Sequence, residues 1–138
     1  MNKIAHIGIA VNDLDAALAL FRDTLGLHVE YRRAVPEQGV EIVGLAVGES
    51  EVELLKPLSP DSGVAKFLEK RGEGIHHVCF EVDDVEATLR DLESRGYALI
   101  DKTPRTGSNG RKLAFVHPKS THGVLIEFYE KQPLADSH

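Results

Sequence analysis

The stretch HIGIAVNDLDAAL at residues 6–18 decides the fold of this chain, because a closely similar stretch, HVCFEVDDVEATL, occurs at residues 77–89. The two stretches align without a gap and are identical at His6/His77, Val11/Val82, Asp13/Asp84, Ala16/Ala87 and Leu18/Leu89. Several other positions carry conservative pairs, such as Ile7 with Val78. An internal repeat of this kind predicts two copies of one structural module.

Each copy begins with alternating apolar residues, which are typical of a β-strand. An Asx pair follows, Asn12-Asp13 or Asp83-Asp84, whose side chains are suited to cap a helix. Apolar residues at helical spacing come next, and Gly26 and Gly96 stand where each helix should end. Further strand patterns cover about residues 28–33, 40–47 and 51–56 in the first copy, and 97–101, 112–116 and 124–129 in the second. The sequence therefore predicts an α+β fold of two tandem β-α-β-β-β modules.

The whole chain of 138 residues has the length of one ordinary domain. Within residues 1–138 we expect module one at about 3–56, a linker at about 57–74, module two at about 75–130 and a loose tail at 131–138. The linker contains a short amphipathic helical pattern around Val64, Phe67 and Leu68.

Composition excludes several classes of protein. The 16 Lys and Arg residues stand against 22 Asp and Glu residues, a net charge of −6, and no basic cluster suited to nucleic acid is present. The lone Cys79 excludes an internal disulfide and a cysteine-based zinc site. No apolar run is long enough to span a membrane, and the first strand pattern begins by Ile4, which leaves no room for a leader peptide. We expect a cytoplasmic protein with a small-molecule or protein partner.

Metal-ligand types recur at matched positions of the repeat. His6 and His77 open the two first strands, while Glu53 and Glu127 lie in the two last strands. Strand alternation places each of them away from the apolar set of its own strand. A single strand histidine is usually structural, but two imidazoles and two carboxylates at equivalent positions favour a divalent cation such as Co²⁺, Mn²⁺, Ni²⁺, Zn²⁺ or Fe²⁺.

The sequence resembles the vicinal oxygen chelate superfamily and, within it, the methylmalonyl-CoA epimerases, over about residues 3–130. The segments that carry the resemblance are HIGIAVNDLDAALALF at 6–21, PEQGVEI at 36–42, VELLKPLSPDSGVAKFLEKRGEGIHHVCFEVDDVEA at 52–87 and HPKSTHGVLIEF at 117–128. The last segment is the most diagnostic of the four.

The resemblance implies a curved mixed sheet around a metal-binding cleft, with His6, Glu53, His77 and Glu127 as ligands of one divalent ion per chain. Co²⁺ is the first expectation, with Mn²⁺, Ni²⁺ or Zn²⁺ as alternatives. The implied activity is epimerisation of (2R)/(2S)-methylmalonyl-CoA by proton abstraction at C2 through a metal-stabilised enolate. The implied partner is an acyl-CoA, and we expect a homodimer.

Inversion at C2 requires a base on each side of the carbon. The resemblance favours Glu41 and Glu127 for these roles, although Glu41 alone reads equally well as a solvent-facing strand residue. Lys119 and Ser120 precede the strand of Glu127, where they are suited to hold the substrate carboxylate or a CoA phosphate, or form an ordinary solvated turn.

Two other functions remain open at this point. Glyoxalase I (lactoylglutathione lyase) shares proton transfer next to a carbonyl and the His-Glu-His-Glu ligand set. A non-catalytic, ligand-sequestering protein of the same fold is the second alternative. Such a protein needs no metal, so the presence of all four ligand types argues against it.

Overall fold

The computed structural model describes residues 1–107 and 109–132 and divides the chain into two compact units. The first unit is His6–His77, and the second combines Met1–Ala5 with Val78–His138. The boundary lies inside two strands, β1 (Lys3–Ala10) and β5 (Gly74–Val82). The start of the chain belongs to the second unit, where the Asn2 N–H donates to the Glu81 carbonyl at 2.9 Å. Of the predicted tail, residues 133–138 lie outside the described residues.

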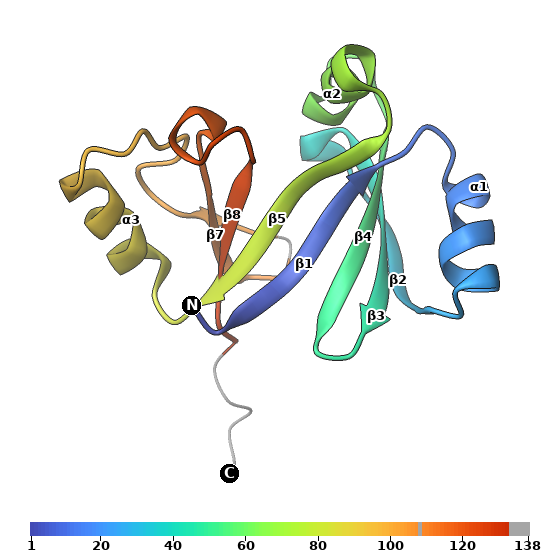
Figure 1. Cartoon of the computed structure of the whole chain (residues 1–138), viewed down its shortest axis with the longest axis horizontal. Coiled ribbons are helices and arrows are strands. Elements are labelled where there is room, and N and C mark those ends of the chain that lie inside the picture. Colours follow the sequence, from blue (N-terminus) through green and yellow to red (C-terminus); the bar gives the residue numbers. More distant parts are fainter. Residues whose placement is uncertain (108, 133–138) are drawn as a thin grey trace, which may run out of the picture. The chain divides into compact units, whose positions relative to one another are not determined.

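The first unit contains one complete module (Figure 1). After β1 come α1 (Leu14–Leu18), the π-helix η1 (Ala19–Thr24), β2 (His28–Val35), the 3₁₀ turn η2 (Pro36–Gln38), β3 (Val40–Val47), β4 (Ser50–Pro57) and α2 (Gly63–Arg71). Its strands run in the order β2-β3-β4-β1. β1 and β4 are parallel, whereas β2/β3 and β3/β4 are antiparallel.

The predicted start and end of the first helix are both confirmed. The Asp13 carboxylate accepts hydrogen bonds from the N–H groups of Asp15 and Ala16 at 2.9 and 3.2 Å, so it caps α1. Gly26 ends the helical segment with φ of 77°, a left-handed conformation that glycine adopts without steric cost. The helix predicted in the linker is also present as α2.

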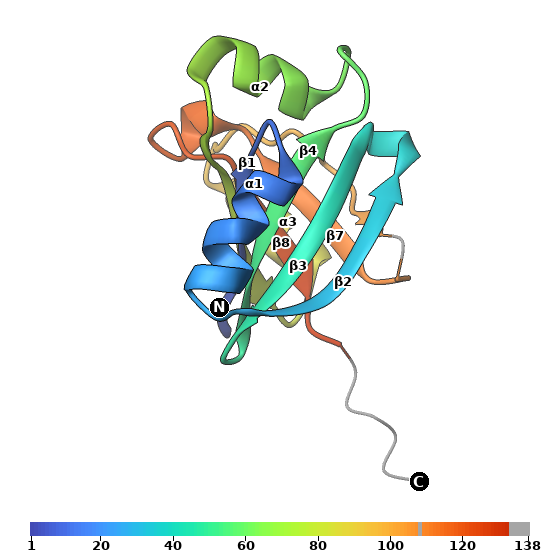
Figure 2. The same ribbon diagram turned by 90° about the vertical axis from the view of Figure 1, so that its right-hand side faces the viewer.

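Helices α1 and α2 both lie against the strands of the first unit (Figure 2). Apolar side chains pack on both faces of these strands. On one face, Leu14 and Leu18 of α1 pack with Val43, Leu45 and Leu54. On the other face, α2 packs over one end of the strands through its residues Val64, Phe67 and Leu68, and the buried residues there are Ala10, Val35, Val40, Ile42 and Leu55. The remainder of this second face carries the polar residues described below.

The second unit repeats the module with β5, α3 (Val85–Ser94), β6 (Arg105–Thr106), β7 (Lys112–Val116), the 3₁₀ turn η3 (Pro118–Ser120) and β8 (Ile126–Glu130). Its strand order is β5-β8-β7-β6, with β5/β8 parallel and β7/β8 and β6/β7 antiparallel. Starting from the first strand of each unit, the orders β1-β4-β3-β2 and β5-β8-β7-β6 are equivalent, and the strand directions match as well. This match confirms the predicted α+β repeat. No helix in the described part of the chain is long and apolar enough to cross a bilayer.

One predicted strand of the second copy is wrong. Residues 97–101 form no ladder, and only Leu99 makes an isolated bridge, to Val116. The segment is instead tied to β7 by the Asp101 carboxylate, which accepts the Phe115 N–H at 2.9 Å. Pro104, which lacks an N–H, lies just before the two-residue β6, which is the second strand of this copy.

Candidate metal centre

Three of the predicted ligand residues meet within the first unit. His6 Nε2 lies 3.0 Å from His77 Nε2 and 3.3 Å from Glu53 Oε1, and His77 Nε2 lies 3.8 Å from the same Glu53 oxygen. The two histidines are buried, and the Glu53 side chain is 12% exposed. His6 and His77 are side chains that could hold a metal ion.

The spacing of these three atoms fits a divalent cation. Metal–nitrogen and metal–oxygen bonds of about 2.1 Å place neighbouring ligand atoms about 3.0 Å apart at right angles and about 3.4 Å apart in a tetrahedron. The observed separations of 3.0, 3.3 and 3.8 Å lie close to these values. The donor set of two imidazoles and one carboxylate suits borderline transition-metal ions.

Gly8 makes room for the His77 ring. It lies two residues after His6 in β1 and pairs with Glu53 of β4. A Cβ atom at this position would lie 2.2 Å from His77 Cε1, far inside any tolerable contact. The glycine of the HIG segment is therefore a space requirement of the site, which sequence reasoning missed.

Tyr31 is a second residue that sequence reasoning missed. Its hydroxyl donates to Glu53 Oε2 at 2.9 Å and lies 3.1 Å from Glu51 Oε1. Burial, reinforced by the carboxylates of Glu53 and Glu51, raises the pKa of this hydroxyl far above its usual range, so Tyr31 stays a neutral donor. Burial also raises the pKa of Glu51, with the Tyr31 hydrogen bond opposing that shift and Glu30 and Glu53 adding to it.

His76 contacts the opposite side of the His77 ring. The two Nδ1 atoms are 2.9 Å apart, and the His76 ring packs edge-on against Phe67 of α2 with centroids 5.1 Å apart. Ligating histidines commonly engage a partner through their second nitrogen, which fixes the tautomer and the ring orientation. His76 thus contacts both the His77 ring and the Phe67 ring.

Glu127 lies in the second unit, where it is buried at 6% exposure. Its place in that unit matches the place of Glu53 in the first. Glu53 pairs with Gly8, two residues after His6, and Glu127 pairs with Cys79, two residues after His77. Its neighbours Ile126 and Phe128 pack in the core beneath α3, so Glu127 points to the opposite face, as the strand alternation predicted.

The structure does not bring Glu41 onto the face that carries the predicted metal ligands. Glu41 alternates with Val40 and Ile42 of β3, which share the face of Tyr31. Its side chain lies on the α1-covered face, where Glu41 Oε2 accepts from Arg32 Nε at 2.8 Å. The role of Glu41 as a base stays a prediction, and the position of its side chain beside Arg32 argues against that role.

Lys119 and Ser120 lie in η3 of the second unit. Lys119 is exposed, and its backbone N–H donates to His117 Nδ1 at 3.1 Å. The Ser120 hydroxyl oxygen accepts the Ala98 N–H at 2.7 Å, which ties the loop to residues after α3. The Ser120 hydroxyl oxygen therefore already takes part in a hydrogen bond that holds the loop in place.

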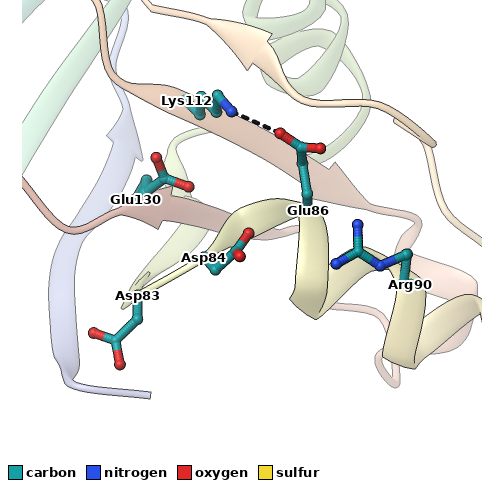
Figure 3. Close-up of a pocket in the computed structure, with 6 residues that line it drawn as sticks. All are labelled: Asp83, Asp84, Glu86, Arg90, Lys112 and Glu130. Atoms are coloured by element: carbon teal, nitrogen blue, oxygen red, sulfur yellow. Dashed lines mark hydrogen bonds and ion pairs between the residues drawn. The ribbon is translucent and has the colours of Figure 1, made fainter.

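A surface pocket of about 310 Å³ in the second unit is lined by none of the predicted site residues (Figure 3). It is lined by Asp83, Asp84, Glu86, Arg90, Lys112 and Glu130. These groups stabilise the start of α3: Asp84 accepts the Ala87 N–H at 3.1 Å, and Lys112 Nζ donates to Glu86 at 2.6 Å. The pocket is explained by helix capping and ion pairing.

Comparison with known proteins points to one superfamily. Residues 5–115 match the model of the glyoxalase/bleomycin resistance protein/dioxygenase superfamily. The human mitochondrial methylmalonyl-CoA epimerase is 38% identical over 128 residues, covering 92% of this chain and 73% of that protein. The ethylmalonyl-CoA/methylmalonyl-CoA epimerase of Cereibacter sphaeroides is 38% identical over 129 residues, covering 92% of this chain and 96% of that protein.

A solved structure gives the same result. A Streptomyces coelicolor methylmalonyl-CoA epimerase variant in complex with 2-nitronate-propionyl-CoA superposes with a TM-score of 0.89 at 38% identity, covering 96% of this chain and 99% of that one. The chain therefore belongs to the glyoxalase/bleomycin resistance protein/dioxygenase superfamily and, within it, to the family of the methylmalonyl-CoA epimerases.

Proposed function

We propose that this protein is a divalent-metal-dependent epimerase of (2R)/(2S)-methylmalonyl-CoA. The observation that carries the proposal is the convergence of His6, His77 and Glu53 within 3.0–3.8 Å, in a chain that is 38% identical to epimerases from human and from Cereibacter sphaeroides. The epimerase relatives support the substrate class, and the closeness of the three side chains supports the binding of a metal ion.

The proposed ligands of the ion are His6, Glu53, His77 and Glu127. The first three are supported by their mutual distances, and Glu127 is supported by its position in β8, equivalent to that of Glu53 in β4. Co²⁺ is the first choice for a mixed nitrogen and oxygen set, with Mn²⁺, Ni²⁺ and Zn²⁺ as alternatives. A bound divalent cation would supply the positive charge that lowers the cost of forming an enolate from the thioester.

The protein must also remove the C2 proton on one side and return one on the other. We assign one side to the Glu127 carboxylate, because it is buried and faces away from the α3 core. Glu41 is the sequence candidate for the other side, and its ion pair with Arg32 on the α1-covered face weighs against it.

Lys119 and Ser120 are proposed to bind the substrate carboxylate or a CoA phosphate. Lys119 offers an exposed cation in η3, and the Ser120 hydroxyl can donate to an anion while its oxygen keeps the Ala98 N–H. A homodimer in the cytoplasm remains our expectation for the assembly and its location.

The proposal is tested by following the C2 proton directly. Metal-stripped protein is incubated in D₂O with racemic methylmalonyl-CoA, and the C2–H signal is followed by NMR before and after adding Co²⁺. We expect the signal to disappear only when the ion is present. Exchange that fails with every divalent ion would overturn the proposal. The methylglyoxal–glutathione hemithioacetal serves as the control substrate, since its turnover instead would assign the chain to glyoxalase I chemistry.

A further inference from the structure

Four residues form one row across the strands of the first unit. Tyr31 of β2 pairs with Gly44 of β3, Gly44 pairs with Glu53 of β4, and Glu53 pairs with Gly8 of β1. Residues with large side chains, Tyr31 and Glu53, therefore alternate with glycines along the row. Each glycine leaves space for a ring from a neighbouring strand, and Glu53 stands between the two rings.

The Tyr31 ring lies over Gly44. A Cβ atom on Gly44 would approach Tyr31 Cζ to 2.3 Å, so only glycine permits this placement. A β-bulge between Val29 and Tyr31 shifts the register of β2 at this point. Bulges commonly re-aim a side chain next to a functional site. Here the strand places Tyr31 on the face of the ligands, with its hydroxyl 2.9 Å from Glu53 Oε2.

The two oxygens of Glu53 thus have different partners. Oε2 accepts the Tyr31 hydrogen bond, whereas Oε1 lies 3.3 Å from His6 Nε2 and 3.8 Å from His77 Nε2. A carboxylate on a flexible side chain loses rotational freedom when it coordinates an ion, and a partner that holds it in place beforehand reduces that loss. The Tyr31 hydroxyl oxygen also lies 3.1 Å from Glu51 Oε1, a second carboxylate of β4.

We infer that Tyr31 is a positioning residue for the metal ligand Glu53: its hydroxyl holds Oε2 so that Oε1 is directed at the two histidines. This inference rests on the proposed function only for the identity of Glu53 as a ligand. Tyr31 acts through Glu53 and contacts no reacting atom.

The experiment is a Co²⁺ titration of metal-stripped, full-length protein by calorimetry, with visible absorption as a second readout of the ion's environment. Tyr31→Phe removes the hydroxyl and keeps the ring. We expect affinity to fall about 10-fold, the lower end for a partner of a metal ligand, with a changed Co²⁺ spectrum. Tyr97→Phe, at a residue 48% exposed and remote in sequence from the site, is the matched control and should leave affinity unchanged.

Two further variants separate positioning from general damage. Gly44→Ala keeps the hydroxyl but displaces the ring, so it should weaken Co²⁺ binding as Tyr31→Phe does. In a Glu53→Ala background, Tyr31→Phe should cause no additional loss, because the group it positions is gone. Unchanged affinity in Tyr31→Phe, or an equal loss with and without Glu53, would overturn the inference.

The readouts also distinguish this inference from the proposed activity. A protein that binds Co²⁺ in a Tyr31-dependent manner but exchanges no C2 proton would retain the positioning role and lose the epimerase assignment. A protein that exchanges the proton equally well with Tyr31→Phe, at unchanged Co²⁺ affinity, would retain the activity and lose the positioning role.

Discussion

The two units share one strand topology, but the residues next to Glu53 in the first unit differ from those next to Glu127 in the second. In the first unit, Glu53 lies between Gly44 and Gly8 on the neighbouring strands. In the second unit, Glu127 lies between Phe115 and Cys79. The missing side chains in the first unit admit the rings of Tyr31 and His77, whereas the second unit fills the same positions with its own side chains.

The two copies of the repeat thus keep a glutamate at equivalent positions but surround it with different side chains. The second strand shows the same divergence: β2 has eight residues and carries Tyr31, whereas β6 has only two. The first unit has thus kept a long strand that brings a hydrogen-bond donor to its glutamate. The following variants test this asymmetry.

The largest effect is expected from His77→Ala, which removes a proposed metal ligand that lies 3.0 Å from His6 Nε2 and 3.8 Å from Glu53 Oε1. We expect Co²⁺ affinity to fall by more than about 100-fold, which exceeds the range for supporting residues. His28→Ala, at an exposed histidine at the start of β2, is the control. Metal content measured after dialysis reads out both variants, and a His77→Ala protein that retains its ion would remove His77 from the ligand set.

The next effect is expected from Gly8→Ala, which tests the space reserved for the His77 ring. The added methyl would meet His77 Cε1 at 2.2 Å, so the ring must move. We expect a loss of about 1–3 kcal/mol in the free energy of unfolding from overpacking, together with weaker Co²⁺ binding. Urea unfolding and calorimetry measure the two quantities.

Gly63→Ala is the matched control for that variant, since a Cβ there meets nothing within 4 Å. It should change neither quantity appreciably. If Gly8→Ala behaved like Gly63→Ala, the first unit would tolerate a side chain beside its glutamate as the second unit does at Cys79, and the proposed asymmetry would fail.

A smaller effect is expected from His76→Ala, which removes the neighbour of His77 Nδ1 and the ring that packs on Phe67. We expect Co²⁺ affinity to fall about 10-fold, near the lower limit for a residue that orients a ligating histidine. His76→Phe keeps the ring packing and should restore stability but not affinity. Equal metal binding in all three proteins would show that His76 contributes only to packing.

Strand alternation explains how much of this site could be read from the sequence. The pairs His6/His77 and Glu53/Glu127 were recognisable because the repeat aligns them, and because the neighbours of Glu127 alternate clearly between apolar and polar. Tyr31 was not recognisable, since its place opposite Gly44 depends on a bulge and a strand register that carry no local sequence pattern.

The face of Glu41 was equally hidden, for a different reason. Strand β3 is covered on both faces, by α1 on one and by α2 with Tyr31 on the other, and its residues are therefore apolar almost throughout. A strand that is buried on both sides shows no period of two, so the direction of its single glutamate could not be inferred. The contact of Glu41 with Arg32 on the neighbouring strand β2 shows which face the glutamate occupies.

The smallest effect follows from that placement. Glu41→Gln removes a charge that lies on the α1-covered face, beside the partly exposed Arg32, so we expect metal affinity to stay constant and C2–H exchange to change less than about 2-fold. The stability cost should stay within about 1 kcal/mol, as for other exposed ion pairs. Glu127→Gln, by contrast, should abolish exchange, because Glu127 is a buried carboxylate on the ligand-type face of its unit. Loss of exchange in Glu41→Gln at full Co²⁺ affinity would show that Glu41 reaches the substrate after all, and that strand β3 must turn that side chain away from Arg32 when the acyl-CoA binds.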